Sequence, residues 1–263
     1  MLKTLVIASM IVLVSTAWTL GDPPATRPFR KPPMIIILKL DDLAHWISPR
    51  WTRVNDFLTE RRIRASYGII GEELAKANAD TIKWIKAVHE AGQIEIWCHG
   101  YHARTAEEKI GEFEVGTADE QAAALKKCQD IARDKLGFEL AAFGPHWSGT
   151  TDETDKALEA TPQIKIWLYG PAKPKYFTRL SIPRIMALEN PTFVPDFEKF
   201  KKIYDDQGSK QSVLVLQGHP DMWQAPGRWE GFVQIIDFLQ AKGCTFMTPT
   251  EYAATLPATS SKP

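Results

Sequence analysis

Short apolar runs alternate with amphipathic segments along most of this chain, from residue 34 to residue 256. The apolar runs, such as 34–40 and 213–216, are rich in branched side chains and are typical of buried strands. The segments between them, such as 74–91 and 229–241, have the apolar spacing of amphipathic helices. Such alternation predicts an α/β fold whose parallel sheet closes, or nearly closes, into a barrel.

Length and composition agree with one α/β domain, because 263 residues with 44% apolar side chains can bury one sizeable core. The expected strands cover 34–40, 63–70, 94–97, 140–143, 164–169, 180–188, 213–216 and 245–247. The expected helices cover 49–62, 74–91, 118–136, 152–160, 196–204 and 229–241, with a short helix from 250.

Two adjacent aspartates, Asp41 and Asp42, directly follow the first expected strand. In α/β folds the carboxyl ends of parallel strands carry the chemistry, so both carboxylates are expected at the edge where a site would form. Neighbouring acids at that place suggest one metal ligand and one base. Taken alone, the pair also suits a solvated turn or the cap of the following helix.

Histidines follow three other expected strands at the same edge: His99, His102, His146 and His219. A single histidine there would more often serve packing or hydrogen bonding. Four of them beside an aspartate pair favour a metal site or an acid/base site. A catalytic zinc takes about three histidine and carboxylate ligands and leaves a position for water, which fits this mixture.

Charge and cysteine content exclude other classes of function. Lys plus Arg equals Asp plus Glu at 32 each, so no net field favours nucleic acid or an anionic membrane surface. Cys98, Cys128 and Cys244 have no CxxC spacing, so neither a disulfide framework nor a cysteine zinc site is indicated.

The amino-terminal end predicts export. Lys3 precedes an apolar run at 5–14, and the small residues at 15–17 suit cleavage by a signal peptidase. We expect a signal peptide at 1–17, a Pro-rich linker at 18–33, one catalytic domain at 34–256 and a flexible tail at 257–263. The protein would be periplasmic or secreted, with no integral membrane domain after cleavage. An uncleaved segment would instead act as a membrane anchor.

The strand-end motifs resemble those of the polysaccharide deacetylases, the NodB-homology or carbohydrate esterase family 4 group. The motifs stand in the family's order: Leu38-Lys-Leu-Asp41-Asp42, Glu95-Ile-Trp-Cys-His99-Gly-Tyr-His102, Phe143-Gly-Pro-His146, Leu214-Val-Leu-Gln-Gly-His219-Pro220 and Phe246-Met-Thr-Pro-Thr-Glu-Tyr252. Each is weak alone, but together they cover residues 34–256. The resemblance implies a distorted (β/α) barrel of about seven parallel strands.

It also implies a hydrolase of non-peptide carbon–nitrogen bonds that removes acetyl groups from a glycan, as amides or esters, using one divalent metal, usually zinc. Asp41 matches the family's general base and His219 its general acid. Asp42 and His99 match metal ligands. The runner-up functions are hydrolysis of another non-peptide carbon–nitrogen bond without metal, and glycan binding by a barrel that has lost its metal ligands.

Two positions depart from the family pattern. Ala103 stands where the family has its second metal histidine, so the expected third ligand is His102, one place earlier. Gly144 stands where the family has an arginine that accompanies the base. His146 would compensate, as a metal ligand or as a donor to the oxyanion.

Several further residues are expected around the substrate. Backbone amides near Tyr101 and Pro145 would stabilise the oxyanion. Trp147 and Trp223 stand in loops beside candidate catalytic histidines, where indole rings would stack on sugars. Arg184 would bind a substrate carboxylate or pair with an acid on the rim. The kind of glycan and the oligomeric state are not encoded in any motif.

Overall fold

The computed structural model describes residues 32–105 and 107–257. The strands are β1 (Ile35–Leu43), β2 (Ala65–Ile69), β3 (Ile94–Cys98), β4 (Ala142–Phe143), β5 (Ile166–Leu168), β6 (Leu180–Ile182), β7 (Val213–Gly218) and β8 (Thr245–Phe246). The α-helices are α1 (Pro49–Glu60), α2 (Gly71–Lys76), α3 (Ala79–Glu90), α4 (Ala118–Lys135), α5 (Asp152–Glu159), α6 (Phe197–Asp206), α7 (Arg228–Ala241) and α8 (Pro249–Thr255). Short 3-10 turns occupy Glu112–Glu114, Gly208–Lys210 and Pro220–Met222. The predicted signal peptide, residues 18–31 of the linker and residues 258–263 of the tail lie outside the described residues.

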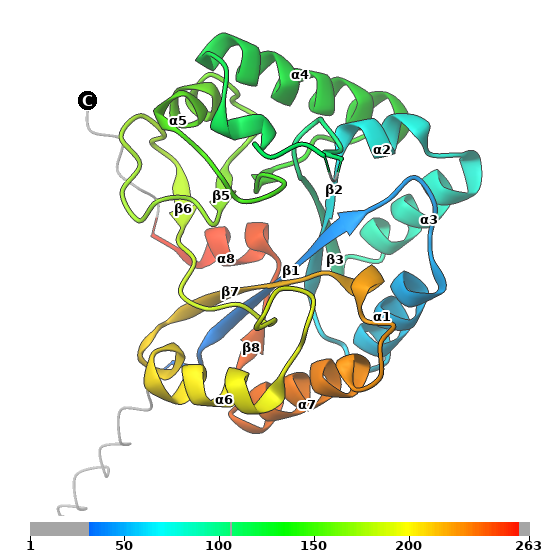
Figure 1. Ribbon diagram of the computed structural model, residues 1–263, viewed down its shortest axis with the longest axis vertical. Helices are drawn as coiled ribbons and strands as arrows, with labels where there is room; N and C mark the ends of the chain where they lie inside the picture. Colours follow the sequence, from blue (N-terminus) through cyan, green and yellow to red (C-terminus); the bar gives the residue numbers. More distant parts are fainter. Residues whose placement is uncertain (1–31, 106, 258–263) are drawn as a thin grey trace, which may run out of the picture. The chain divides into compact units, whose positions relative to one another are not determined.

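The strands form one parallel sheet, curled so that helices cover its outer face (Figure 1). Seven strands follow one another in the order β6-β5-β4-β3-β2-β1-β7, and β8 pairs with the first residues of β1. No pairing joins β6 to β7 in the described part of the chain, so the sheet stays open there. The predicted distorted (β/α) barrel of parallel strands is therefore confirmed, as a half-barrel.

Contacts from residues that follow β5 and β6 bridge the opening between β6 and β7. The hydroxyl of Tyr169 accepts a hydrogen bond from the Gln217 amide at 3.0 Å and lies 3.3 Å from the Val215 carbonyl. The Leu188 amide donates to the Gln217 carbonyl at 3.2 Å. Tyr169, after β5, and Leu188, after β6, are thereby tied to β7.

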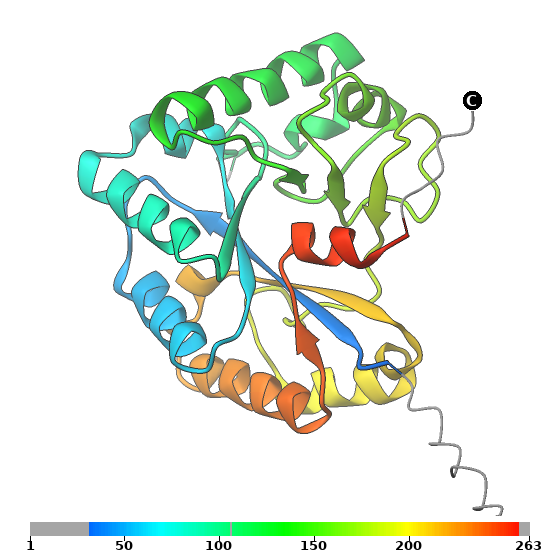
Figure 2. The same ribbon diagram turned by 180° about the vertical axis from the view of Figure 1, so that it is seen from behind.

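Alternation along β1 divides its side chains between two layers. Ile36, Leu38 and Leu40 belong to the large core beneath the helices. Ile37 belongs to a smaller cluster inside the barrel, and helix α8, seen from behind in Figure 2, packs residues 252 and 253 against that cluster. Successive strand residues point to opposite faces, so Lys39 follows Ile37 into the interior. A charged side chain is thus placed in the centre of the barrel.

Three sequence expectations were wrong in detail. The strand expected at 180–188 ends at Ile182. The helix expected at 74–91 is two helices, because the Asn78 side chain accepts a hydrogen bond from the Thr81 amide at 2.9 Å and caps α3. The aspartates do not follow β1 but lie within it, since the strand continues to Leu43 with a shift of register after Leu40. None of the helices described is long and apolar enough to cross a membrane.

Candidate active site

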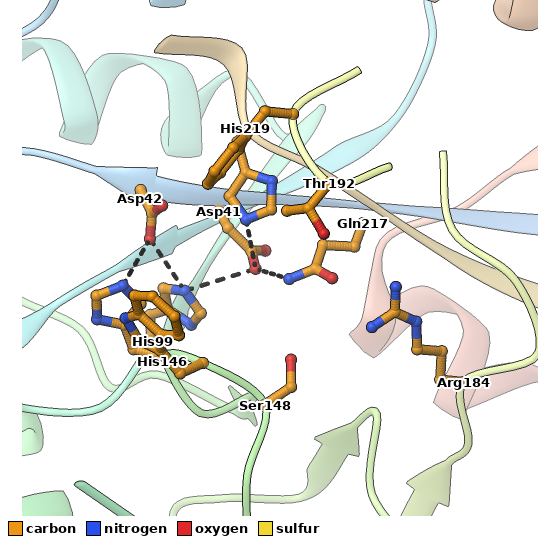
Figure 3. A pocket seen from close by; sticks show the side chains of 11 residues that line it. Asp41, Asp42, His99, His146, Ser148, Arg184, Thr192, Gln217 and His219 are labelled. Carbon is orange, nitrogen blue, oxygen red and sulfur yellow. Dashed lines mark hydrogen bonds and ion pairs between the residues drawn. The ribbon is translucent and has the colours of Figure 1, made fainter. Parts of the chain in front are cut away.

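A pocket of about 320 Å³ opens at the carboxyl ends of β1, β3 and β7 (Figure 3). Eleven residues line it: Asp41, Asp42, His99, His146, Trp147, Ser148, Arg184, Thr192, Phe193, Gln217 and His219. The expected convergence of strand-end residues therefore holds for both aspartates and for three of the four histidines.

The backbone is strained around this pocket. Four lining residues other than glycine have positive φ angles: Asp42 at 67°, Trp147 at 70°, Ser148 at 59° and Phe193 at 72°. Such conformations cost side-chain-bearing residues about 1 kcal/mol or more each and persist where the surrounding structure enforces them. At Asp42 the left-handed turn allows two consecutive carboxylates to contribute to one pocket instead of opposite faces of β1.

Asp42, His99 and His146 bring three donor atoms together on one side of the pocket. Asp42 Oδ1 lies 3.2 Å from His99 Nε2 and 3.6 Å from His146 Nε2. This oxygen is buried and has no hydrogen-bond partner among the described residues. Burial opposes the charge on Asp42, but a protonated His99 beside it outweighs burial and keeps the pKa of the carboxyl well below its ordinary value.

The hydrogen bond of His99 fixes which of its ring nitrogens is free. His99 Nδ1 lies 2.6 Å from the Gly144 carbonyl oxygen, which can only accept, so Nδ1 carries the proton. In a neutral ring the lone pair of Nε2 then faces Asp41 Oδ2 at 3.5 Å and Asp42 Oδ1 at 3.2 Å. Two acceptors and a lone pair repel one another unless a proton or a cation lies between them.

His146 completes the set as a neutral imidazole. Burial and the charge of His99 lower the pKa of His146 to about 4, so its ring is uncharged at neutral pH. Donor atoms around a tetrahedral zinc lie about 3.3 Å apart, given bonds of about 2.0–2.1 Å. Both distances from Asp42 Oδ1 are close to that value. The described side chains do not, as they stand, form a finished metal centre of three or more His, Cys, Asp or Glu residues, but the chemistry of this donor set fits a divalent ion.

Asp41 is held by a buried cation. Lys39 Nζ lies 2.8 Å from Asp41 Oδ1 and 2.6 Å from Oδ2, and Gln217 Nε2 donates to Oδ2 at 2.6 Å. Burial would raise the pKa of Asp41, but the Lys39 charge more than offsets it and holds that pKa below the ordinary range. Sequence reasoning missed Lys39, although a lysine inside an apolar strand, two residues before an aspartate, signals a shared face.

Lys39 also explains the glycine that departs from the family motif. A Cβ atom at Gly144 would come 2.9 Å from Lys39 Cε and 3.3 Å from the Leu168 carbonyl oxygen. The Lys39 side chain therefore fills the space that the Cβ atom of any other residue at position 144 would need. The positive charge beside Asp41 comes from β1 and not from the loop after β4.

His219 lies on the other side of Asp41 and is supported by a second residue that sequence reasoning missed. Glu189 accepts hydrogen bonds from His219 Nδ1 at 2.7 Å, from the His219 amide at 2.8 Å and from Trp223 Nε1 at 2.6 Å. His219 Nε2 faces Asp41 Oδ2 at 3.9 Å. Burial alone would lower the pKa of His219, but the hydrogen bond to Glu189 and the charge of Asp41 raise it above its ordinary value. Glu189 lies in an irregular loop, where no periodic pattern points to it.

The structure does not bring His102 to the pocket. Its Nε2 lies 2.8 Å from Glu108 Oε1 and its Nδ1 3.3 Å from Glu72 Oε2, in a partly exposed cluster outside the lining. The chain turns away after His99 because the amides of Tyr101 and His102 both donate to Glu112. His146, from the loop after β4, lies beside Asp42, where His102 was predicted.

Of the four other residues expected to contact substrate through an indole ring or a backbone amide, one lines the pocket and three do not. Trp147 lines the pocket and is 56% exposed. Trp223 is buried, stacks on Phe232 with ring centroids 4.5 Å apart, and reaches the pocket only through Glu189. Neither Tyr101 nor Pro145 lines the pocket. The Tyr101 amide is already paired and proline has no amide hydrogen, so neither residue's own amide is free to meet an oxyanion.

Comparisons with known proteins identify the fold. No protein-family model matches the chain, and no curated protein sequence is significantly similar. A family 4 acetyl xylan esterase from Clostridium thermocellum, solved with a cobalt ion, matches with a TM-score of 0.59 at 16% identity, covering 84% of this chain and 91% of that chain. An allantoinase matches with a TM-score of 0.65 at 13% identity, covering 88% and 93%. A CE4 family pseudoenzyme from Bacillus anthracis matches with a TM-score of 0.59 at 14% identity, covering 84% and 66%.

The chain therefore has the fold of the polysaccharide deacetylase, or CE4, group over most of its length. This confirms the resemblance that the strand-end motifs indicated. These solved structures include both enzymes and a pseudoenzyme, so the fold occurs in proteins with and without catalytic activity.

Proposed function

We propose that this protein is a metal-dependent deacetylase that hydrolyses acetyl groups, as N-acetyl amides or O-acetyl esters, from a glycan. The observation that carries the proposal is the unpartnered Asp42 Oδ1, buried between His99 Nε2 and His146 Nε2. Buried carboxylate oxygens are costly without a partner, and a cation satisfies this one together with the lone pair of His99.

Asp42, His99 and His146 would hold the ion, with zinc as the expected metal. The structure of a CE4 esterase with a cobalt ion supports a divalent metal in this fold. Such an ion polarises a carbonyl group and acidifies a bound water. The Gly144 carbonyl orients His99 for this role by fixing its tautomer, as second partners of metal-binding histidines generally do.

Asp41 would act as the general base. Its carboxyl stays ionised because Lys39 is beside it, and Lys39 and Gln217 fix its orientation. Proton transfer from the attacking water to Asp41 lets the water oxygen add to the acetyl carbonyl carbon. Positioned bases of this kind contribute about 10²–10⁴-fold to rate.

His219 would act as the general acid. Its Nδ1 donates to Glu189, and in the doubly protonated ring, which the raised pKa of His219 favours, Nε2 carries a second proton that faces the pocket. That proton passes to the leaving nitrogen or oxygen as its bond to the acetyl carbon breaks, so the products are acetate and a free amine or hydroxyl group. Base and acid lie on the same side of the pocket, 3.9 Å apart at their nearest atoms.

Acetate release from a panel of acetylated glycans tests this function. We expect release after zinc loading, loss of release with a chelator, and loss with Asp42→Ala. Release that persists with chelator and in Asp42→Ala would instead support a hydrolase that works without metal. Glycan binding with no release by the zinc-loaded wild type would support a non-catalytic glycan-binding barrel.

We also propose that the protein is exported, as its amino-terminal sequence suggests. Sequencing the amino terminus of protein recovered from the periplasm or medium should show a new start near residue 18. Recovery of the intact amino terminus in a membrane fraction would support the anchor instead.

A further inference from the structure

Arg184 is a charged residue of the pocket that the proposed chemistry does not use. It lies two residues after β6 and is exposed at the pocket lining. In Figure 3 its guanidinium group extends toward the pocket from the side opposite His99 and His146. It makes no hydrogen bond or ion pair of its own with the residues that the structure describes.

The carboxylates around the pocket are already engaged elsewhere. Asp41 is bound by Lys39 and Gln217, and Glu189 is bound by His219 and Trp223. Asp42 faces the two histidines across the pocket. No acid remains for Arg184 within the lining, so its guanidinium group is free to bind an anion that enters from solvent.

The position of Arg184 is prepared by its surroundings. The guanidinium carbon lies 5.1 Å from the centroid of the Tyr169 ring, and the Tyr169 hydroxyl is hydrogen-bonded to β7 through the Gln217 amide. Contact with the aromatic ring restrains the guanidinium group before a ligand arrives, so less side-chain entropy is lost when the ligand binds. The hydroxyl-bearing residues Ser148 and Thr192 line the same pocket.

We propose that Arg184 binds a carboxylate carried by the substrate, so that the substrate class is an acetylated glycan built from acidic sugars. The inference rests on the proposed deacetylase function and deepens it. The planar guanidinium fork matches a carboxylate through two parallel hydrogen bonds. An unpaired guanidinium group in a pocket of about 320 Å³ is a suitable partner for one carboxylate on the bound glycan. Neutral acetylated glycans offer Arg184 no such partner.

Paired substrates test this proposal. The probes are an acetylated uronic acid tetramer and the same tetramer with its carboxylates converted to primary amides. Wild-type protein should have a kcat/KM about 10-fold or more higher on the carboxylate form, because charge-assisted hydrogen bonds are stronger than neutral ones. Arg184→Gln should remove that preference while changing kcat/KM on the amide form by less than about 3-fold. Arg184→Lys should restore part of it, since the charge remains but the fork is lost.

Arg133→Gln is the matched control, because Arg133 lies on α4 and pairs with Asp130 outside the pocket. It should leave the preference intact. Equal rates of the wild type on both tetramers, or equal losses on both in Arg184→Gln, would overturn the carboxylate proposal.

Calorimetry separates this proposal from the deacetylase function. If no probe releases acetate, the deacetylase function fails, but binding of the deacetylated tetramers can still be compared. Tighter binding of the carboxylate form, lost in Arg184→Gln, would support the anion site in a non-catalytic barrel. Equal binding of both forms would overturn it.

Discussion

Lys39 and Asp41 form an ion pair in the centre of the barrel, with Nζ 2.6 Å from Oδ2 and both side chains almost fully buried. The lysine stem fills the space beside Gly144, where the family motif has an arginine. The positive charge beside Asp41, the proposed base, therefore comes from the strand that carries Asp41 and not from a loop. Two residues apart on one strand, the pair needs no loop to be correctly placed.

Removing Lys39 should both destabilise the protein and shift its pH profile. Lys39→Met leaves the Asp41 carboxylate buried without its cation, which costs about 3–5 kcal/mol in a buried pair. The pKa of Asp41 should rise, because Lys39 is what lowers it. A base works only when ionised, so the acid limb of the kcat/KM profile should move to higher pH by about one unit or more. Lys126→Met, at an exposed ion pair on α4, is the control. An unchanged acid limb would contradict the assignment.

Glu189→Gln should move the opposite limb. The amide cannot match the carboxylate in stabilising a charged His219, so the pKa of His219 should fall. A general acid works only when protonated, so the alkaline limb of kcat/KM should move to lower pH by about one unit. Glu198→Gln, on the exposed face of α6, offers the same chemical change without this contact. If both variants keep the wild-type alkaline limb, Glu189 does not control His219.

The two tryptophans expected at the substrate should behave differently. Trp147→Ala should raise KM for a glycan oligomer several-fold with little change in unfolding free energy, because the ring is 56% exposed at the pocket. Trp223→Ala should cost about 3–5 kcal/mol, because that ring is buried against Phe232. Urea unfolding and steady-state kinetics on both variants separate the two effects. A stable Trp223→Ala protein with raised KM would place Trp223 at the substrate after all.

The fold could be predicted because periodicity and turn residues carry it. Branched apolar runs such as 34–40 and 213–216 can hardly be anything but buried strands, and parallel strands bring their carboxyl ends to one edge. Asp41, His99 and His219 follow from that rule alone. The helix break at Asn78 could also have been predicted, because asparagine is a common helix-capping residue and this one interrupts the apolar pattern.

The rest of the site depends on the conformation of loops, and loop sequences have no regular pattern from which side-chain positions could be predicted. His102 and His146 both follow strands, and only the turn imposed by Glu112 on the amides after His99 decides between them. Glu189 reaches His219 across 30 residues of sequence, from a segment without regular structure. Family spacing pointed to the residues near position 103, but the structure places His146, from another loop, beside Asp42.

The choice between His146 and His102 is tested most directly by metal content. Purified wild-type protein, His146→Ala and His102→Ala should be loaded with zinc, desalted, and measured for zinc per chain together with acetate release. We expect about one equivalent in the wild type and in His102→Ala, and less than about a tenth with no acetate release in His146→Ala, because His146 Nε2 and not His102 faces Asp42. Full zinc occupancy in His146→Ala with loss in His102→Ala, or no zinc in the wild type, would contradict the proposed metal site.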